Sequence, residues 1–408
     1  MLNINSIRDD FPILHNSVYD HPLVYLDNGA TTQIPKAVLE CLEYHYCRQN
    51  ANVHRGIHYL SEQSTIAMEK ARKTVSEFLH SSNEYEIVFT SGTTDALNIV
   101  AFGYAEPRLK NGKRVITTEI EHHSNFVPWQ MASKRSGGSF SVIPYENNAL
   151  DLEYLKLVLE KEDTILLTVT ALSNVLGLKT PLKKIIDIAH GYGVPVCVDA
   201  AQAMRHGEIN VQELDCEFLA FSAHKMMGPA GVGVLYGKSE YLEKIEPMRY
   251  GGGMVDKVGL EKTSIGQIPF CLEAGTPNYP GIIAFEAAIH YLSEIGITQI
   301  ASREAELTSY LERQLRDLSE VHIMGGSEAK YGVVSMVADG VHPYDLASVL
   351  DKYGIAGRSG SHCAQPLVRK LGYESIMRFS PAFYNTTEEI DFLKDSMKKA
   401  LEMLRKWK

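Results

Sequence analysis

The chain has 408 residues, of which 45% are hydrophobic and 22% charged, and its net charge is −10. A chain of this length and balance can bury a large core, and its composition excludes a disordered, collagen-like or coiled-coil protein. The excess of negative charge disfavours binding to nucleic acids and to anionic membranes, so we expect no partner of either kind.

The N-terminal segment and the cysteines both indicate a cytoplasmic protein. The segment MLNINSIRDDFPIL lacks the basic and apolar regions of a secretory signal, and no apolar run reaches the roughly 18 residues that span a membrane. The cysteines are scattered without CxxC spacing, which is typical of reduced thiols rather than of disulfides or a zinc site. They are Cys41, Cys47, Cys197, Cys216, Cys271 and Cys363.

Short apolar runs alternate with amphipathic segments between about residues 85 and 236. The runs are residues 86–90, 114–119, 139–144, 164–171, 194–200, 218–223 and 231–236, and helix-like segments occupy 95–105, 151–161 and 181–193. Strands that are apolar throughout and separated by helices are typical of a sheet buried on both faces. We therefore predict an α/β doubly wound core, with a mainly parallel seven-stranded sheet and helices on both faces.

The pattern changes after about residue 285, where long helices and short strands predict a smaller α+β C-terminal domain. We expect helices over 281–295 and 298–318, strands over 332–337 and 355–358, and a last helix that runs to Trp407 and opens with a Thr386–Glu389 capping box. The predicted parts are an N-terminal segment that packs with the small domain, a large domain and the small domain, at residues 1–24, 25–284 and 285–408.

In an open α/β sheet, ligands bind beyond the carboxyl ends of the strands, and four strands here end in polar groups. The strand 86–90 runs into SGTTDALN, which places Gly92, Thr93 and Thr94 at a strand-to-helix turn. Free N–H groups and two hydroxyls at such a turn would bind a phosphate. A simple Ser/Thr helix cap is the alternative.

Asp199 ends the apolar run 194–200, with Gln202 three residues later. A carboxylate at that depth needs a partner, and the pyridinium nitrogen of pyridoxal 5′-phosphate (PLP) is one. The carboxylate keeps the ring protonated, which makes it an electron sink. A helix cap or a metal ligand remains an alternative role for Asp199.

Ser222, His224 and Lys225 lie at the end of the run 218–223. Lysine is rarely buried without a partner, and desolvation lowers its pKa, which suits Schiff-base formation with an aldehyde. Ser222 and His224 would then reach the phosphate of the same cofactor. The alternative is a lysine that extends to the surface.

His122 and His123 follow the strand 114–119, and at most one of two adjacent histidines in a strand would face a pocket. His122 could stack on a planar cofactor or move protons. Zinc is the competing interpretation, because His54 and His58 are four residues apart, but Gly56 weakens the helix that this spacing requires.

None of these features is specific alone, but their order is. A phosphate cup, a stacking histidine, a ring-partner aspartate and a Schiff-base lysine follow successive strands of one sheet. This constellation predicts a PLP enzyme.

The chain resembles the class V aminotransferase family of fold-type I PLP enzymes, and within it the SUF-type (group II) cysteine desulfurases. The resemblance extends from YLDNGATT to RFSPAFYNT, which is most of the chain. Its most specific blocks are NVHRGIH (52–58), SGTTDALN (91–98), EHHSN (121–125), VDAAQA (198–203), SAHK (222–225), EAGTPN (273–278) and RSGSHCAQPL (358–367).

The resemblance implies a homodimeric enzyme that uses PLP to convert L-cysteine to L-alanine. The sulfur would become a persulfide on Cys363 and pass to a small SUF-type acceptor protein for iron–sulfur cluster assembly. The implied catalytic residues are Lys225, Cys363 and His122. The implied cofactor-binding residues are Thr93, Thr94, His122, Asn174, Asp199, Gln202, Ser222, His224, Lys225 and, from the partner subunit, Thr276. The implied substrate-binding residues are Asn174, Arg358 and Arg378, and no metal is implied.

The Cys363 segment departs from the group II pattern, because Ser361 stands where those enzymes commonly have the first of two histidines. DNGATT near the N-terminus also reads more like group I. We expect His362 and Arg358 to favour the Cys363 thiolate. A buried structural thiol is the alternative reading of Cys363.

Three other functions compete with this interpretation. A selenocysteine lyase, a kynureninase-like hydrolase or a true aminotransferase would keep PLP and change the reaction. A nucleotide-phosphate binder would use the SGTT turn, but neither GxGxxG nor GxxxxGK[ST] is present. A catalytically silent sulfur carrier or scaffold would not need Lys225 and Asp199.

Overall fold

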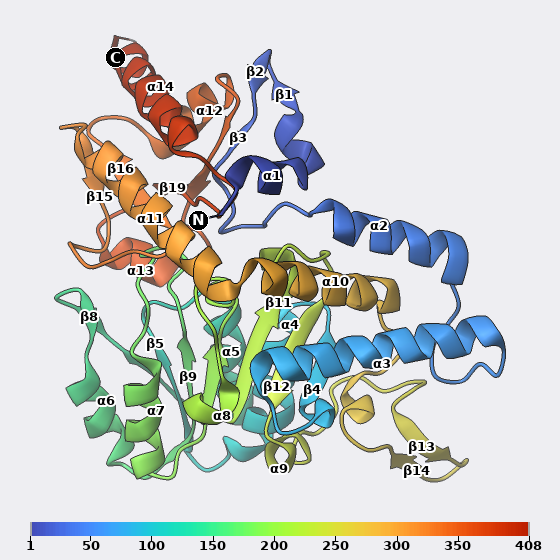
Figure 1. Ribbon diagram of the computed structural model, residues 1–408. Coiled ribbons are helices and arrows are strands. Elements are labelled where there is room, and N and C mark those ends of the chain that lie inside the picture. The colour runs from blue at the N-terminus through green and yellow to red at the C-terminus, as the bar shows by residue number, and fades with distance from the viewer. Residues whose placement is uncertain (1, 407–408) are drawn as a thin grey trace.

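All seven predicted strands form one sheet in the computed structural model, which describes residues 2–406 (Figure 1). The strand order is β4-β12-β11-β10-β9-β5-β6. Of these strands, only β12 runs antiparallel to its neighbours, because the short turn after β11 contains no crossover helix. The bounds are Ile87–Thr90 (β4), Arg114–Thr118 (β5), Ser139–Ile143 (β6), Thr164–Thr170 (β9), Val196–Asp199 (β10), Phe218–Ser222 (β11) and Gly233–Gly237 (β12).

Helices cover both faces of this sheet, as its uniformly apolar strands predicted. Along β11, Leu219 and Phe221 belong to one buried cluster, and Phe218 and Ala220 belong to another on the opposite face. Figure 1 shows α3 and α10 in front of the strands, with α4 and α5 behind them. The covering helices are α3 (Tyr59–Leu79), α7 (Leu182–Gly191) and α10 (Tyr279–Ile295) on one face, and α4 (Thr93–Asn98) and α5 (Val127–Ser136) on the other.

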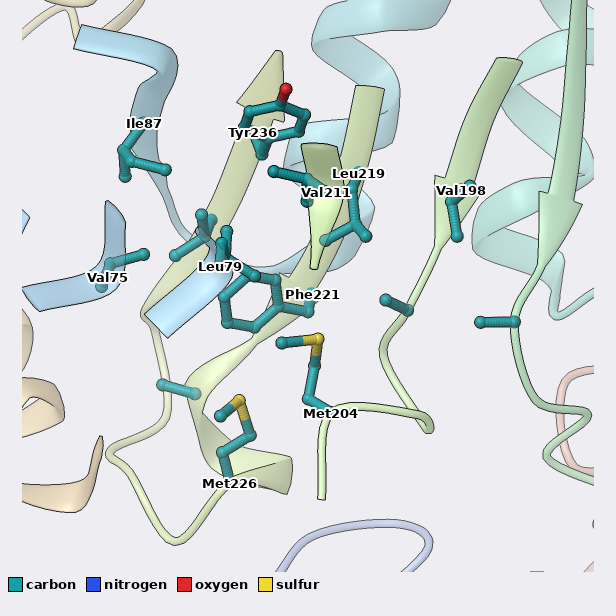
Figure 2. Packing of buried hydrophobic residues seen from close by; sticks show 14 of the residues in the cluster. Val75, Leu79, Ile87, Val198, Met204, Val211, Leu219, Phe221, Met226 and Tyr236 are labelled. Carbon is teal, nitrogen blue, oxygen red and sulfur yellow. The ribbon is translucent and has the colours of Figure 1, made fainter. Parts of the chain in front are cut away.

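Phe221 lies in the middle of the larger cluster, among Leu79, Met204 and Met226 (Figure 2). Its side chain is fully buried, so Phe221→Ala removes a ring and leaves a cavity. We expect this change to lower the free energy of unfolding by about 3–5 kcal/mol, measured by urea titration. Leu157→Ala, at an exposed position on α6 (Leu152–Leu159), is the control and should cost less than about 0.5 kcal/mol. Equal effects of the two changes would contradict this packing.

A second, four-stranded sheet forms in the C-terminal part of the chain, in the order β15-β16-β19-β18, with every pair antiparallel. The predicted capping box is confirmed, because Thr386 Oγ1 accepts from the Glu389 N–H group and Glu389 Oε2 accepts from that of Thr386. The predicted helix end at Trp407 lies outside the described residues. The elements are β15 (Val321–Ile323), β16 (Val334–Ala338), β18 (Arg358–Gly360), β19 (Ile376–Phe379), α11 (Ile297–Arg316), α12 (Pro343–Asp351) and α14 (Thr387–Lys406).

The N-terminal segment contacts this C-terminal part. Arg8 of α1 (Ile4–Asp9) forms an ion pair with Glu389 at 2.8 Å. The strand β3 (Val24–Tyr25) pairs in parallel with β17 (Ile355–Ala356). As a result, Val24 and Leu26 pack in the same hydrophobic cluster as the residues of the second sheet. The domain boundaries stay a prediction.

Shorter elements complete the fold. No helix in residues 2–406 combines the length and apolarity needed to cross a membrane. The remaining helices are α2 (Lys36–Tyr44), α6 (Leu152–Leu159), α8 (Val211–Leu214), α9 (Ser239–Leu242) and α13 (Gln365–Lys370), and the hairpins are β1/β2 (Ser17–Val18, His21–Pro22), β7/β8 (Tyr145–Glu146, Ala149–Leu150) and β13/β14 (Val255–Val258, Thr263–Ile265).

Candidate active site

The carboxyl ends of β4, β5, β9, β10 and β11 lie at one edge of the large sheet, where they border a cavity of about 280 Å³. This volume is close to the lower end for small-molecule sites. The cavity brings together every predicted site residue except Thr276. Those residues are Thr93, Thr94, His122, Asn174, Asp199, Gln202, Ser222, His224, Lys225, Arg358, Cys363 and Arg378.

Asp199 and Lys225 line this cavity from adjacent strands. Asp199 is the last residue of β10, and Lys225 ends a 3-10 turn directly after β11. Burial raises the pKa of Asp199, while burial lowers the pKa of Lys225 to about 8 against the opposing charge of Asp199. The site therefore offers a lysine whose neutral amine is accessible near physiological pH, close to a buried carboxylate.

The Asp199 carboxylate is only partly satisfied by the chain. Its Oδ1 accepts from the Ala201 N–H group at 2.9 Å, which is the turn-capping contact that the sequence left open. Within the described chain, no group donates to Oδ2. A protonated pyridine nitrogen would supply the missing donor, so this residue fits a PLP ring.

The turn after β4 forms an anion-binding cup. Thr93 forms two hydrogen bonds with Ser222, because its N–H group and its hydroxyl both lie 2.7 Å from Ser222 Oγ. Gly233 of β12 packs directly against Gly92, and a Cβ atom there would lie 2.3 Å from the Gly92 Cα atom. The N-cap residue Gly92 has no side chain to cap α4, so the first-turn N–H groups other than that of Thr93 can meet a phosphate together with the hydroxyls.

His122 follows β5, as the sequence predicts, and directly precedes the 3-10 turn His123–Asn125. Its Nδ1 accepts from the Ser124 N–H group at 3.1 Å, which leaves the proton of the neutral ring on Nε2. Burial, together with the charge of Lys225, lowers the pKa of His122 to about 3. An uncharged ring at the cavity wall suits stacking on a planar cofactor. His123 does not line the cavity, and its Nε2 accepts from the Gln365 N–H group.

Asp27 holds two arginines at the cavity rim. Pairing of β18 with β19 places Arg358 opposite Arg378, and both contact the Asp27 carboxylate, at 2.7 Å and 3.3 Å respectively. Arg378 Nη1 also donates to the Asn174 carbonyl at 3.1 Å. Two buried polar atoms here, Arg378 Nε and Asn174 Oδ1, find no partner in residues 2–406. A buried donor without an acceptor marks a place for a substrate carboxylate.

Cys363 is exposed, which rules out the buried structural thiol. Both His362 and Cys363 adopt left-handed backbone angles, with φ of 50° and 53°. Two hydrogen bonds hold this backbone: the Asn174 side chain donates to the His362 carbonyl at 2.7 Å, and the His123 N–H group donates to the Cys363 carbonyl at 2.6 Å. The thiol is thereby fixed at the mouth of the cavity.

The expectation that His362 favours the Cys363 thiolate is wrong. The His362 ring is buried and donates from Nε2 to the Ile376 carbonyl at 3.1 Å. Burial, with the charge of Arg378, lowers the pKa of His362 to about 3, so the ring is neutral. The nearby positive charges that remain for Cys363 are those of Arg358 and Arg378.

The histidines behind the zinc interpretation serve other contacts. His54 Nε2 lies 3.0 Å from Glu69 Oε1, and His58 caps α3 by accepting from the Ser61 N–H group. His54 precedes the helix, so the two rings do not share a helical face.

Comparison with known proteins identifies the family over nearly the full length of the chain. The Aminotransferase class-V family model matches residues 24–393. The chain belongs to the class V aminotransferase family. A probable cysteine desulfurase of Halalkalibacterium halodurans is 42% identical over 402 residues, which cover 98% of each chain.

Two solved structures of class V relatives superpose closely. The cysteine desulfurase CsdA of Escherichia coli has a TM-score of 0.92 and 36% identity, covering 99% of this chain and 100% of its own. The cysteine desulfurase of Thermococcus onnurineus has a TM-score of 0.92 and 37% identity, covering 99% of both chains. These matches confirm the predicted fold and family.

Three residues of this class V site were not assigned a role from the sequence. Ser124 bridges two predicted residues, because its hydroxyl lies 2.6 Å from Thr94 Oγ1 and 3.0 Å from His122 Nδ1. Asp27 binds the two arginines described above. Glu121 is buried behind the cavity and accepts from the Thr170 N–H group at 2.9 Å; burial raises its pKa to about 8. Ser124 and Glu121 lie in EHHSN, and Asp27 lies in YLDNGATT.

Thr276 lies in a second cavity of about 810 Å³, on the surface of the chain. His54, Arg55 and Pro277 line the same cavity. Thr276 is therefore separate from the phosphate cup of its own chain, and its predicted place in a partner subunit stays a prediction.

Proposed function

We propose that this class V family member is a PLP-dependent cysteine desulfurase that converts L-cysteine to L-alanine and retains the sulfur on Cys363. One observation carries this assignment: a single cavity joins the half-buried Lys225 and the buried Asp199 to an exposed cysteine and to a buried arginine with a free N–H group. Full-length relatives named cysteine desulfurase support it.

The residues of the cavity fit PLP. Thr93, Thr94, Ser222 and His224 would hold the phosphate, Asp199 the pyridine nitrogen and Gln202 the ring hydroxyl, with His122 stacked on the ring. Lys225 would hold the aldehyde carbon. When bound, PLP withdraws electrons from the α-carbon of the amino acid.

Arg378 binds the substrate carboxylate through the Nε group that the chain leaves free. Asn174 Nδ2 gives one hydrogen to the His362 carbonyl and offers its second to the same carboxylate. Lys225 Nζ takes the α-proton, because its lowered pKa makes the neutral amine available. Cys363 Sγ then attacks the substrate sulfur. A sulfur–sulfur bond forms, the carbon–sulfur bond breaks, and the carbon fragment takes up protons to become alanine. Cysteine and the Cys363 thiol thus give alanine and a persulfide, and no external oxidant or reductant is needed.

The proposed assembly is a cytoplasmic homodimer in which Thr276 completes the phosphate site of the partner subunit. Its location in a separate surface cavity supports this placement. The exposed Cys363 supports transfer of the sulfur to a small SUF-type acceptor protein, which in turn would supply iron–sulfur cluster assembly. A reducing cytoplasm keeps Cys363 free to react.

Absorbance and product analysis test this function. We expect the purified protein to be yellow, to lose that band with borohydride, and to form alanine from L-cysteine in equal amount to the sulfur that thiols can release. A colourless protein that PLP cannot reconstitute would exclude the cofactor. A keto acid in place of alanine would instead identify an aminotransferase.

The depressed pKa of Lys225 predicts the pH dependence of cofactor loading. Only the neutral amine attacks an aldehyde, and burial brings the midpoint of its formation from 10.5 to about 8. The rate at which the apoprotein captures PLP should therefore rise with pH through about 8 and level off above it. Stopped-flow absorbance measures this rate, and a rise centred near 10.5 would contradict the desolvation of the Lys225 amine.

Arg378→Lys tests the substrate carboxylate site. Lysine keeps the positive charge but loses the planar fork, including the free Nε group. We expect KM for L-cysteine to rise about tenfold or more, corresponding to a lost charge-assisted hydrogen bond of about 1.5–3 kcal/mol. The exposed Arg369→Lys is the control. An unchanged KM for the Arg378 variant would remove Arg378 from the site.

A further inference from the structure

A buried ion pair, Arg72–Glu273, lies outside the cavity of the active site. Both side chains are inaccessible, and the Arg72 guanidinium contacts Glu273 with two prongs, at 2.7 Å and 2.9 Å. The rings of Phe89 and Phe270 lie 4.7 Å and 5.4 Å from the guanidinium carbon. This planar, two-pronged contact in an apolar surrounding fixes the orientation of both side chains.

The pair is attached to the strand that leads into the phosphate cup. Arg72 Nη1 donates to the Ile87 carbonyl at 2.8 Å, and Glu273 Oε1 accepts from the Phe89 N–H group at 2.6 Å. Both are backbone groups of β4, which ends at Thr90, just before Gly92 and Thr93. The pair therefore anchors the strand whose end forms the cup of this chain.

The same pair anchors the segment that carries Thr276. Glu273 precedes Thr276 by three residues, in a segment without regular structure after the 3-10 turn Phe270–Leu272. On the other side, Arg72 Nε donates to Glu69 at 2.9 Å, and Glu69 holds His54 at 3.0 Å. Burial opposes ionisation of Glu69, but hydrogen bonds from His54 and Arg72 lower its pKa to about 2. His54 and Thr276 line the same cavity.

We propose that Arg72 and Glu273 are positioning residues for the cofactor phosphate in both subunits of the dimer. Through β4 they set the cup of their own chain, and through the segment 273–276 they set the Thr276 that enters the cup of the partner. The second half rests on the proposed function, in which Thr276 acts across the dimer. Removing one partner of a buried pair leaves an uncompensated group, so displacement of both segments follows.

The experiment compares binding of PLP and of pyridoxal, which lacks the phosphate, to dimeric apoprotein. Arg72→Lys keeps the buried charge and loses the fork, and Glu273→Gln keeps an acceptor for Phe89 and loses the charge. Each variant should weaken PLP binding about tenfold and leave pyridoxal binding unchanged. Lys73→Ala, which removes an exposed ion pair from the same helix, is the control and should alter neither affinity.

A double variant tests the path to Thr276. Thr276→Ala alone should weaken PLP binding, and adding it to Glu273→Gln should weaken binding no further, because Thr276 is already displaced. If the two effects multiply, Glu273 does not act through Thr276.

Folded Arg72→Lys and Glu273→Gln dimers that bind PLP like the parent would overturn the proposal. Equal losses of affinity for PLP and for pyridoxal would also overturn it, because they indicate a general loosening of the site. Arg72→Lys carries the test alone if Glu273→Gln fails to fold. A Thr276→Ala variant with unchanged PLP affinity would instead refute the placement of Thr276 across the dimer, and with it the second half of the proposal.

Discussion

Lys225→Ala should abolish the formation of alanine from L-cysteine, with a loss in kcat of about 10³-fold or more. The change removes the group that holds the cofactor aldehyde and the base that takes the α-proton, and among residues 2–406 no other lysine lines the cavity. The variant should also lose the yellow band that borohydride removes from the parent. Rates are measured by alanine release, and Lys183→Ala, at an exposed site on α7, should match the parent.

The folded state of the variant must be checked, because burial of a charged lysine is itself costly and its removal can raise stability. A thermal unfolding midpoint at or above that of the parent would show that lost activity reflects lost chemistry. If the folded Lys225→Ala protein still formed alanine at more than a hundredth of the parental rate, Lys225 would not be the base.

Cys363→Ser should separate cofactor chemistry from sulfur transfer. The hydroxyl is a poor nucleophile toward sulfur compared with a thiolate, so alanine formation should fall about 10²-fold or more. The yellow band and PLP affinity should remain, because Cys363 lies at the mouth of the cavity and its thiol makes no hydrogen bond to the part of the chain that the structure describes. Alanine and total released sulfur are measured in parallel.

Cys47→Ser is the matched control, since Cys47 is the other exposed cysteine. It should retain full activity and full sulfur transfer. Unchanged sulfide release by the Cys363 variant would mean that the sulfur leaves without attack by a cysteine of this chain, and the persulfide mechanism would be wrong.

The large sheet could be predicted because its local signals agree with its tertiary environment. Strands such as 218–222 are apolar on both faces, and the structure buries both faces under helices. The site followed from one geometric rule, since polar residues after parallel strands must gather at one edge. Asp199 and Lys225 were thus found without knowledge of the strand order.

The second sheet and the rim of the site could not be predicted in the same way. Arg358 and Arg378 meet at Asp27, which is more than 300 positions away in the chain, through the pairing of β18 with β19. No local pattern encodes that register. The neutral state of His362 likewise depends on burial and on Arg378, neither of which its neighbours in sequence reveal.

The sequence of helix α3 also contains a periodic pattern that predicts its fold. Its buried residues Met68, Ala71, Val75 and Leu79 recur every three or four positions, which is the helical period. Arg72 lies on the buried side of the same helix. The periodic pattern therefore indicates a charged residue among apolar ones at this position. Its partner Glu273 is 201 positions away, so the ion pair itself needed the structure.

In the proposed reaction, Cys363 takes the sulfur of L-cysteine while the rest of the substrate becomes alanine. The most direct test is mass spectrometry of the Cys363 peptide after one turnover with L-cysteine labelled with heavy sulfur, trapped by an alkylating reagent. We expect one added, labelled sulfur atom on Cys363, in equal amount to the alanine formed, and none on Cys47. Alanine formed with no labelled sulfur on Cys363 would contradict it.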